Sequence, residues 1–106
     1  MKDTDTDIPF NDWSSSKLVQ GLKHSTWRGK VYGKRGDTFQ HLNKRYRLIH
    51  EPFHMPLGVL IHYLYRLEGA ENPEELTRVL CSIKRCKPEQ LDMQELGWLH
   101  VFAEVG

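Results

Sequence analysis

A lysine, a threonine and an arginine lie within six positions of one another, at Lys23, Thr26 and Arg28. In an extended chain alternate side chains point to the same side, so Thr26 and Arg28 share a face, and a lysine at the strand entry can turn over it. A threonine hydroxyl becomes a nucleophile when a base takes its proton, and a lysine whose pKa is lowered by burial and by a nearby arginine can be that base. The arginine can stabilise an oxyanion or bind a phosphate. These three residues predict a site that binds an anion or activates a nucleophile.

Basic residues are concentrated around this segment. Between Lys17 and Arg47 the sequence has nine basic residues and a single acid, Asp37, although the formal net charge of the whole chain is only +1. Aromatic residues interleave with the cations, at Trp27, Tyr32, Phe39 and Tyr46. Cations beside aromatics suit phosphate contact and base stacking, so this stretch favours a groove for nucleic acid or a nucleotide. The ordinary alternative is a solvated basic surface.

The elements that would position these residues follow from sequence pattern. Asn11 or Asp12 can cap a helix that runs to about Leu22. Asn72 followed by Pro73 predicts the start of a second helix, with basic residues near its C-terminal end. Residues 24–30, 37–42, 44–50, 57–65 and 98–105 are predicted as strands, 57–65 being the most apolar and therefore central. Short strands with tight turns predict an α+β fold, a small and mostly antiparallel β-barrel with two flanking helices.

Three short motifs in order carry a family resemblance. They are G-x-K-x-x-T-x-R over residues 21–28, Gly36-Asp37, and Glu68-Gly69 ahead of a helix. Together they resemble the activating-signal-cointegrator homology (ASCH) domain, over residues 8–106. The resemblance implies a PUA-like β-barrel, a fold related to an RNA-binding domain. Some members of the family are linked to RNA binding, and small bacterial members hydrolyse N4-acetylcytidine.

The resemblance also assigns roles to residues. In the amidohydrolase members a lysine and a threonine of the opening motif and a later glutamate are catalytic, which correspond here to Lys23, Thr26 and Glu68. Glu71 is the alternative to Glu68, because a small loop shift would exchange them. The cleft would bind its ligand through neighbouring polar residues: Arg28, Lys30, Lys34, Arg35 and His24.

Three functions use this predicted cleft. The first is hydrolysis of the exocyclic amide of an N4-acylated cytidine, in which Glu68 holds a water or passes a proton to the leaving amine. The second is a non-catalytic RNA-binding module whose cations contact phosphates. The third is a ribonuclease. The expected partner is accordingly RNA, a nucleoside or a nucleotide.

Other features restrict the class of protein. His50-Glu51-Pro52-Phe53-His54 matches the H-E-x-x-H zinc signature, but that motif works on a helix and Pro52 opposes one, so we expect neither a metal nor another cofactor. No apolar run is long enough to span a bilayer, so we expect no membrane partner. With only two cysteines and no expected disulfide, a reduced, cytoplasmic location is favoured. Residues 1–7 are predicted to be a disordered acidic tail. Cys81 and Cys86 lie five positions apart, so in a continuous helix they would not share a face and a disulfide is not expected.

Overall fold

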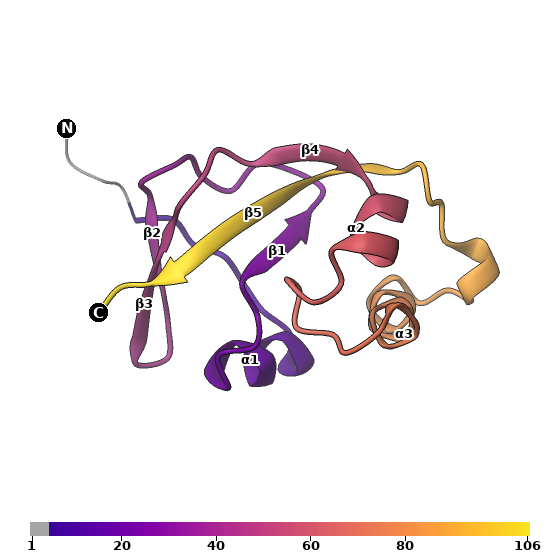
Figure 1. The fold of residues 1–106 in the computed structure, drawn as a ribbon, viewed down its shortest axis with the longest axis horizontal. Coiled ribbons are helices and arrows are strands. Elements are labelled where there is room, and N and C mark those ends of the chain that lie inside the picture. Colours follow the sequence, from indigo (N-terminus) through magenta and orange to yellow (C-terminus); the bar gives the residue numbers. More distant parts are fainter. Residues whose placement is uncertain (1–4) are drawn as a thin grey trace.

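The computed structural model describes residues 5–106, and its sheet is organised around one long strand. This strand, β5 (Leu96–Glu104), pairs with three others, and all the strand pairings are antiparallel (Figure 1). Its partners are β1 (Ser25–Arg28), β4 (Phe53–Pro56) and β3 (Lys44–Leu48), and β3 pairs in turn with β2 (Thr38–His41). The five strands form a curled half-barrel. The predicted α+β class with a small antiparallel sheet is therefore confirmed.

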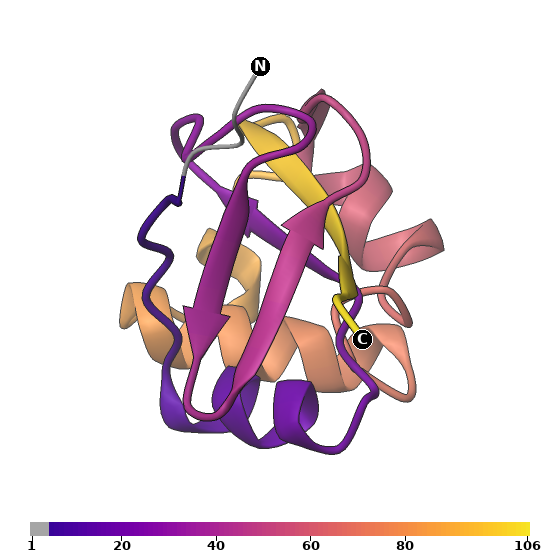
Figure 2. The same ribbon diagram turned by 90° about the vertical axis from the view of Figure 1, so that its left-hand side faces the viewer.

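Two helices begin where the sequence predicts. The Asn11 side chain accepts a hydrogen bond from the Ser14 backbone N–H at 2.8 Å and caps α1 (Asp12–Val19). Asn72 does the same for α3 (Pro73–Lys84), accepting from the Glu75 backbone N–H at 2.8 Å. Both helices lie on the same side of the molecule, below the β2–β3 hairpin in Figure 2.

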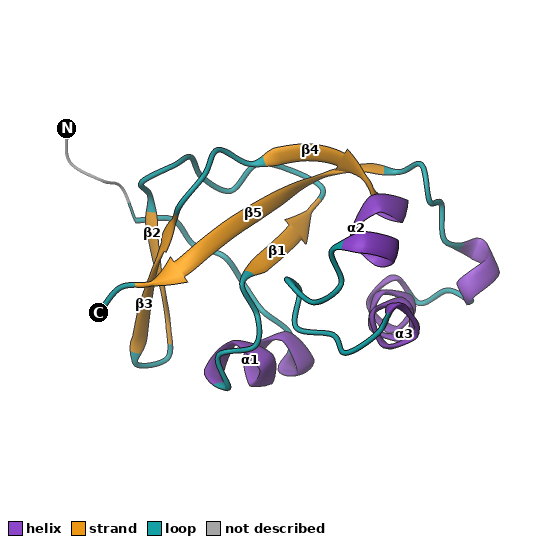
Figure 3. Cartoon of the chain, in the orientation of Figure 1, coloured by secondary structure: helices purple, strands orange, loops and turns teal. Residues whose placement is uncertain are grey.

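The predicted central strand at 57–65 is wrong, because these residues form helix α2 (Leu57–Tyr63) (Figure 3). Leu57, Leu60 and Ile61 recur at helical spacing and are buried, so one face of the helix enters the core. The segment before it, which was not among the predicted strands, forms edge strand β4, where Pro56 ends the pairing with β5. Proline is tolerated at such an edge because the missing N–H is not needed by a second neighbour. The fold thus has three α-helices where two were predicted, and a short 3₁₀ helix, η1 (Pro88–Gln90).

The core has two parts. The larger packs α2 and α3 against β5 through buried apolar side chains such as Leu60, Leu76 and Leu99. The smaller lies under the β2–β3 hairpin and contains Phe39, whose ring stacks on Tyr46 with centroids 5.2 Å apart. The segment that carries the opening motif runs beside the larger part.

The N-terminal segment contacts the hairpin. Asp5 forms an isolated bridge with Thr38 and an ion pair with Arg45, with 2.6 Å between Asp5 Oδ1 and Arg45 Nη1. The Thr6 backbone N–H donates to the Thr38 carbonyl at 2.7 Å. These residues belong to the tail that was predicted to be disordered, and its first four residues lie outside the described ones. In the described chain no helix has the length and apolar character that a membrane crossing requires.

Candidate functional site

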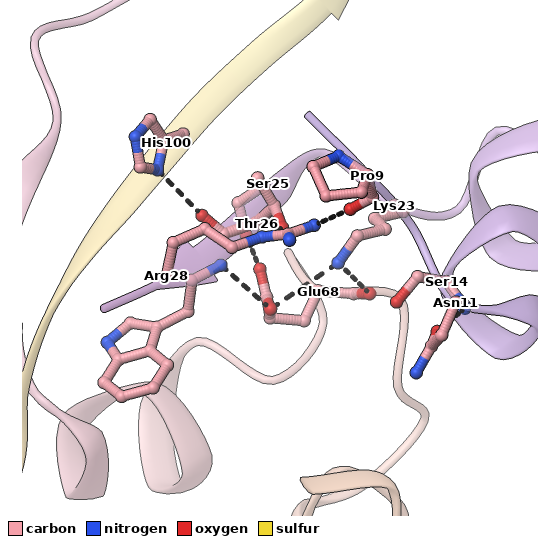
Figure 4. Close-up of polar contacts among 10 residues, drawn as sticks. Pro9, Asn11, Ser14, Lys23, Ser25, Thr26, Arg28, Glu68 and His100 are labelled. Carbon is pink, nitrogen blue, oxygen red and sulfur yellow. Dashed lines mark hydrogen bonds and ion pairs between the residues drawn. The ribbon is translucent and has the colours of Figure 1, made fainter. Parts of the chain in front are cut away.

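A cavity of about 450 Å³ opens between α1, β1 and α3. It contains four of the residues that the sequence singled out, namely Lys23, Thr26, Arg28 and Glu68. The rest of its wall comes from the segment before α1, from α1 itself, from Trp27 and Gly29 at β1, and from one face of α3. Figure 4 shows the polar side chains of this cavity converging on the edge of β1.

Glu68 reaches the cavity through a loop that extends the sheet. The backbone N–H groups of His24 and Ser25 both donate to the Leu67 carbonyl, at 2.7 and 3.0 Å, so the loop after α2 runs along the edge of β1. The next residue, Gly69, has a φ of +100°, and a side chain there would meet the Cβ of Lys17 at 2.9 Å. Only glycine suits that position, which fixes the glutamate just before it at the strand edge.

The Glu68 carboxylate is buried and has three partners (Figure 4). It accepts from the Ser25 hydroxyl at 2.5 Å and from the Trp27 backbone N–H at 3.3 Å, and it lies 3.5 Å from the Lys23 ammonium nitrogen. These three contacts hold the carboxylate in one orientation. Ser25 was not among the predicted site residues, because strand alternation places it with Trp27 on the face opposite Thr26 and Arg28.

Lys23 is buried even more deeply than Glu68, with only 3% of its surface exposed. Burial lowers the pKa of its amine, the charge of Arg28 lowers it further, and the charge of Glu68 opposes both effects. The amine also donates to the Glu68 backbone carbonyl at 3.3 Å. A buried lysine with a lowered pKa, held by two fixed oxygens, gives up its proton more readily than a solvated lysine, which suits a general base.

Arg28 holds the Thr26 hydroxyl on the other side of the site. The guanidinium Nε donates to Thr26 Oγ1 at 2.9 Å, and Nη2 donates to the Pro9 carbonyl. The guanidinium also packs against aromatic rings, with its carbon 5.3 Å from the Phe10 centroid and 5.6 Å from that of Tyr32. Since Thr26 Oγ1 accepts from an arginine, its own proton remains available to a base, and developing negative charge on the oxygen is stabilised.

His100 supports this strand from its neighbour β5. Its Nδ1 lies 3.2 Å from the Thr26 carbonyl oxygen, and its Nε2 accepts from the Tyr32 backbone N–H at 3.0 Å. The second bond requires an unprotonated Nε2, so Nδ1 carries the proton and donates to Thr26. Burial lowers the pKa of this imidazole, which agrees with the neutral form.

The cavity walls are largely aromatic and aliphatic. Trp13 from α1 and Trp27 from β1 contribute indole rings, and α3 presents the apolar face that includes Val79 and Ile83. Alternation along the strand places Trp27 opposite Thr26 and Arg28, which predicts a core position for its ring. It does pack against the larger core cluster, and it also lines the cavity. The α3 wall was missed because an apolar stripe at helical spacing ordinarily marks core.

The other predicted ligand-binding residues do not line this cavity. His24, Lys30, Lys34 and Arg35 are exposed in the described structure and lie outside its wall. Glu71, the alternative to Glu68, is exposed too, and its backbone N–H donates to the Glu75 carboxylate.

Several cations of the basic stretch, residues 17–47, form ion pairs in the fold. Acids from distant parts of the chain pair with several of its cations, at N–O distances of 3.6 Å for Lys17 with Glu75 and 3.5 Å for Lys44 with Glu104. The local excess of positive charge seen in the sequence is therefore partly compensated in the fold.

The H-E-x-x-H match is not helical. His54 lies in β4, where its ring stacks on Trp98 with centroids 4.1 Å apart, and His50 precedes the strand and stacks on Phe53 at 4.2 Å. Within residues 5–106 no group of three histidine, cysteine or acidic side chains is arranged to hold a metal ion.

Comparison of the chain with protein-family models, with curated proteins and with solved structures gives no match.

Proposed function

We propose that this protein is a hydrolase that cleaves the amide of a small N-acylated nucleoside in the cavity beside β1. The observation that carries the proposal is the buried Lys23–Glu68 pair at the edge of β1, in the same cavity as Thr26 and Arg28. The substrate class, an N4-acylated cytidine, comes from the resemblance to the ASCH amidohydrolases. The geometry supports a small ligand and an acid–base reaction.

The residues supply each proton transfer that amide hydrolysis needs. Lys23, as the neutral amine, takes the Thr26 proton while the hydroxyl oxygen attacks the acyl carbon, and Arg28 stabilises the oxyanion that forms. The acyl C–N bond then breaks as the amine nitrogen receives a proton, which Glu68 passes on from Lys23. Water hydrolyses the resulting ester and restores the threonine. The products are the nucleoside with a free exocyclic amino group and a carboxylic acid.

The cavity favours a small substrate over a polymer. Its volume of about 450 Å³ falls in the range of roughly 300–1,000 Å³ that is typical of small-molecule sites. Its cations are engaged with protein oxygens: Lys23 with Glu68, Arg28 with Thr26 and Pro9, and Lys84 with Glu95 at 3.0 Å. Indole and aliphatic walls suit a nucleobase better than a phosphate backbone.

The direct test is incubation of the purified protein with N4-acetylcytidine and chromatographic separation of the products. We expect cytidine from the wild type, with rates at least about 100-fold lower for Lys23→Met and for Thr26→Val. Lys34→Ala, which removes an exposed cation outside the cavity, is the matched control and should keep wild-type activity. Circular dichroism and thermal unfolding check that each variant is folded.

Two outcomes would contradict the proposal. The first is that the wild type releases no cytidine, and the second is that a folded Lys23→Met protein is as active as the wild type. Salt-sensitive RNA binding without turnover would instead favour the RNA-binding module, and cleavage of RNA would favour the ribonuclease.

A further inference from the structure

The two cysteines meet where helix α3 ends. The helix stops at Lys84, and Arg85 adopts a left-handed conformation with a φ of 54°. The Cys86 backbone N–H then donates to the Cys81 carbonyl at 3.0 Å, which is the six-residue hydrogen bond of a Schellman motif. In this motif the side chains at those two positions contact each other. The expectation that the cysteines lie on different faces is therefore wrong, because the helix does not continue through Cys86.

The two thiols differ in exposure and share one hollow. Cys81 is buried and Cys86 is half-buried, and Cys86 is near enough to act on the ionisation of Cys81. Both line an open surface hollow of about 560 Å³ in which three of the other wall residues, Arg78, Arg85 and Lys87, are basic. Glu89 is the acid whose charge acts on Cys81. An anionic molecule that enters this hollow would meet Cys86 first.

We propose that Cys81 and Cys86 form a reversible dithiol site that a small anionic disulfide, such as oxidised glutathione, converts to an intramolecular disulfide. This site lies outside the cavity beside β1, and the inference does not depend on the proposed hydrolase activity. The carboxylates of the oxidant match the basic rim. The Schellman turn places the second thiol beside the first.

The exchange balances as two substitutions at sulfur. The Cys86 thiolate attacks one sulfur of the oxidant, a mixed disulfide forms, and one glutathione thiolate leaves. The Cys81 sulfur then attacks the Cys86 sulfur and releases the second glutathione. The two cysteines lose two electrons and two protons, which appear in two glutathione thiols. Burial, the neighbouring thiol and Glu89 raise the pKa of the Cys81 thiol, so the more accessible Cys86 is the thiol that reacts first.

The test is equilibration of the full chain in buffers with different ratios of reduced to oxidised glutathione, followed by acid quenching, unfolding and alkylation. The sequence has only these two cysteines, so intact mass reports both. In oxidising buffer we expect a monomer two hydrogen atoms lighter that takes no alkyl group, and in reducing buffer a protein that takes two. Non-reducing digestion with trypsin, which cuts after Lys84 and Arg85, should leave the Cys81 peptide joined to the Cys86 peptide until a reductant is added.

Two single variants make the result decisive. Cys81→Ser should stop at a glutathione adduct on Cys86, and Cys86→Ser should react more slowly with the oxidant than Cys81→Ser. The inference is overturned if the oxidised wild type also retains glutathione, if it still takes two alkyl groups, or if its disulfide joins two chains into a dimer.

Discussion

The edge of β1 and the β2–β3 hairpin both carry cations in ion pairs, but the pair at β1 is buried and the pair at the hairpin is exposed. At β1, Lys23 and Glu68 are buried together, with 2% and 7% of their side-chain surfaces exposed. On the hairpin, Lys44 pairs with Glu104 at the same distance of 3.5 Å, but 41% and 52% of those side chains are exposed. Water and salt screen the hairpin pair, whereas the buried pair is shielded from both.

The comparison shows that the surroundings of a charge matter more than its place in a basic stretch. Burial lowers the pKa of Lys23 and so makes its proton easier to remove. A solvated lysine holds its proton and acts as a point charge. A count of charges in the sequence does not distinguish a buried lysine from a solvated one, although only the buried lysine suits acid–base chemistry.

The largest effect should come from removing one member of the buried pair. Glu68→Ala leaves the Lys23 amine, the Ser25 hydroxyl and the Trp27 N–H without their carboxylate, and we expect the free energy of unfolding to fall by about 3–5 kcal/mol. Glu104→Ala, which removes the exposed partner of Lys44 at the end of β5, should change it little. Urea denaturation of both variants measures the difference. Equal losses would mean that the contrast between the two regions is wrong.

A smaller effect should follow from filling the space beside Trp27. A Cβ at Gly97 would lie 2.2 Å from two carbon atoms of the indole, so Gly97→Ala forces Trp27 to shift at the cavity wall. We expect a destabilisation of about 1–3 kcal/mol and a change in tryptophan fluorescence. Gly29→Ala is the matched control, since a Cβ there has no neighbour within 4 Å. A Gly97→Ala protein as stable as Gly29→Ala would show that the indole is not fixed in this place.

The smallest effect concerns pH. Because folding lowers the pKa of His100, the unfolded chain binds its proton more readily, and this residue makes the folded state less stable as the pH falls below about 6.5. Protonation would also oppose the Tyr32 N–H that donates to Nε2. We expect part of the loss in unfolding free energy between pH 7 and pH 5 to be absent in His100→Asn, as measured by urea denaturation. His62→Asn, a change at an exposed position on α2, should keep the wild-type slope, and an unchanged slope in His100→Asn would contradict the expectation.

Local signals in the sequence predicted a large part of the fold. Asn72 and Pro73 specify a helix start through their own side chains, and that prediction is confirmed. The prediction of a strand over residues 57–65 failed because a short apolar segment with β-branched residues fits a buried strand or a buried helix equally well. Its helical state depends on packing against α3 and β5, which no local pattern shows. The local sequence pattern also did not predict the turn at Arg85 that brings Cys81 and Cys86 together.

The candidate site was predictable only in part. Lys23, Thr26 and Arg28 lie close in sequence, so strand geometry alone brings them near one another. Glu68 is more than 40 positions away and was suggested by resemblance; the structure places it 3.5 Å from the Lys23 amine. Ser25 and the apolar wall from α3 could not be found in this way, because their roles depend on contacts between distant segments.

The central position of β5 also bears on the order in which the protein folds. Its pairing of Val101 with Ser25, and of Leu99 with Phe53, joins residues that are far apart along the chain. During synthesis β1, β3 and β4 must wait for β5 before the sheet can form, while α1 and α3 can begin from local contacts. Loop closure over such separations slows folding, so this small domain should fold more slowly than a helical bundle of its size.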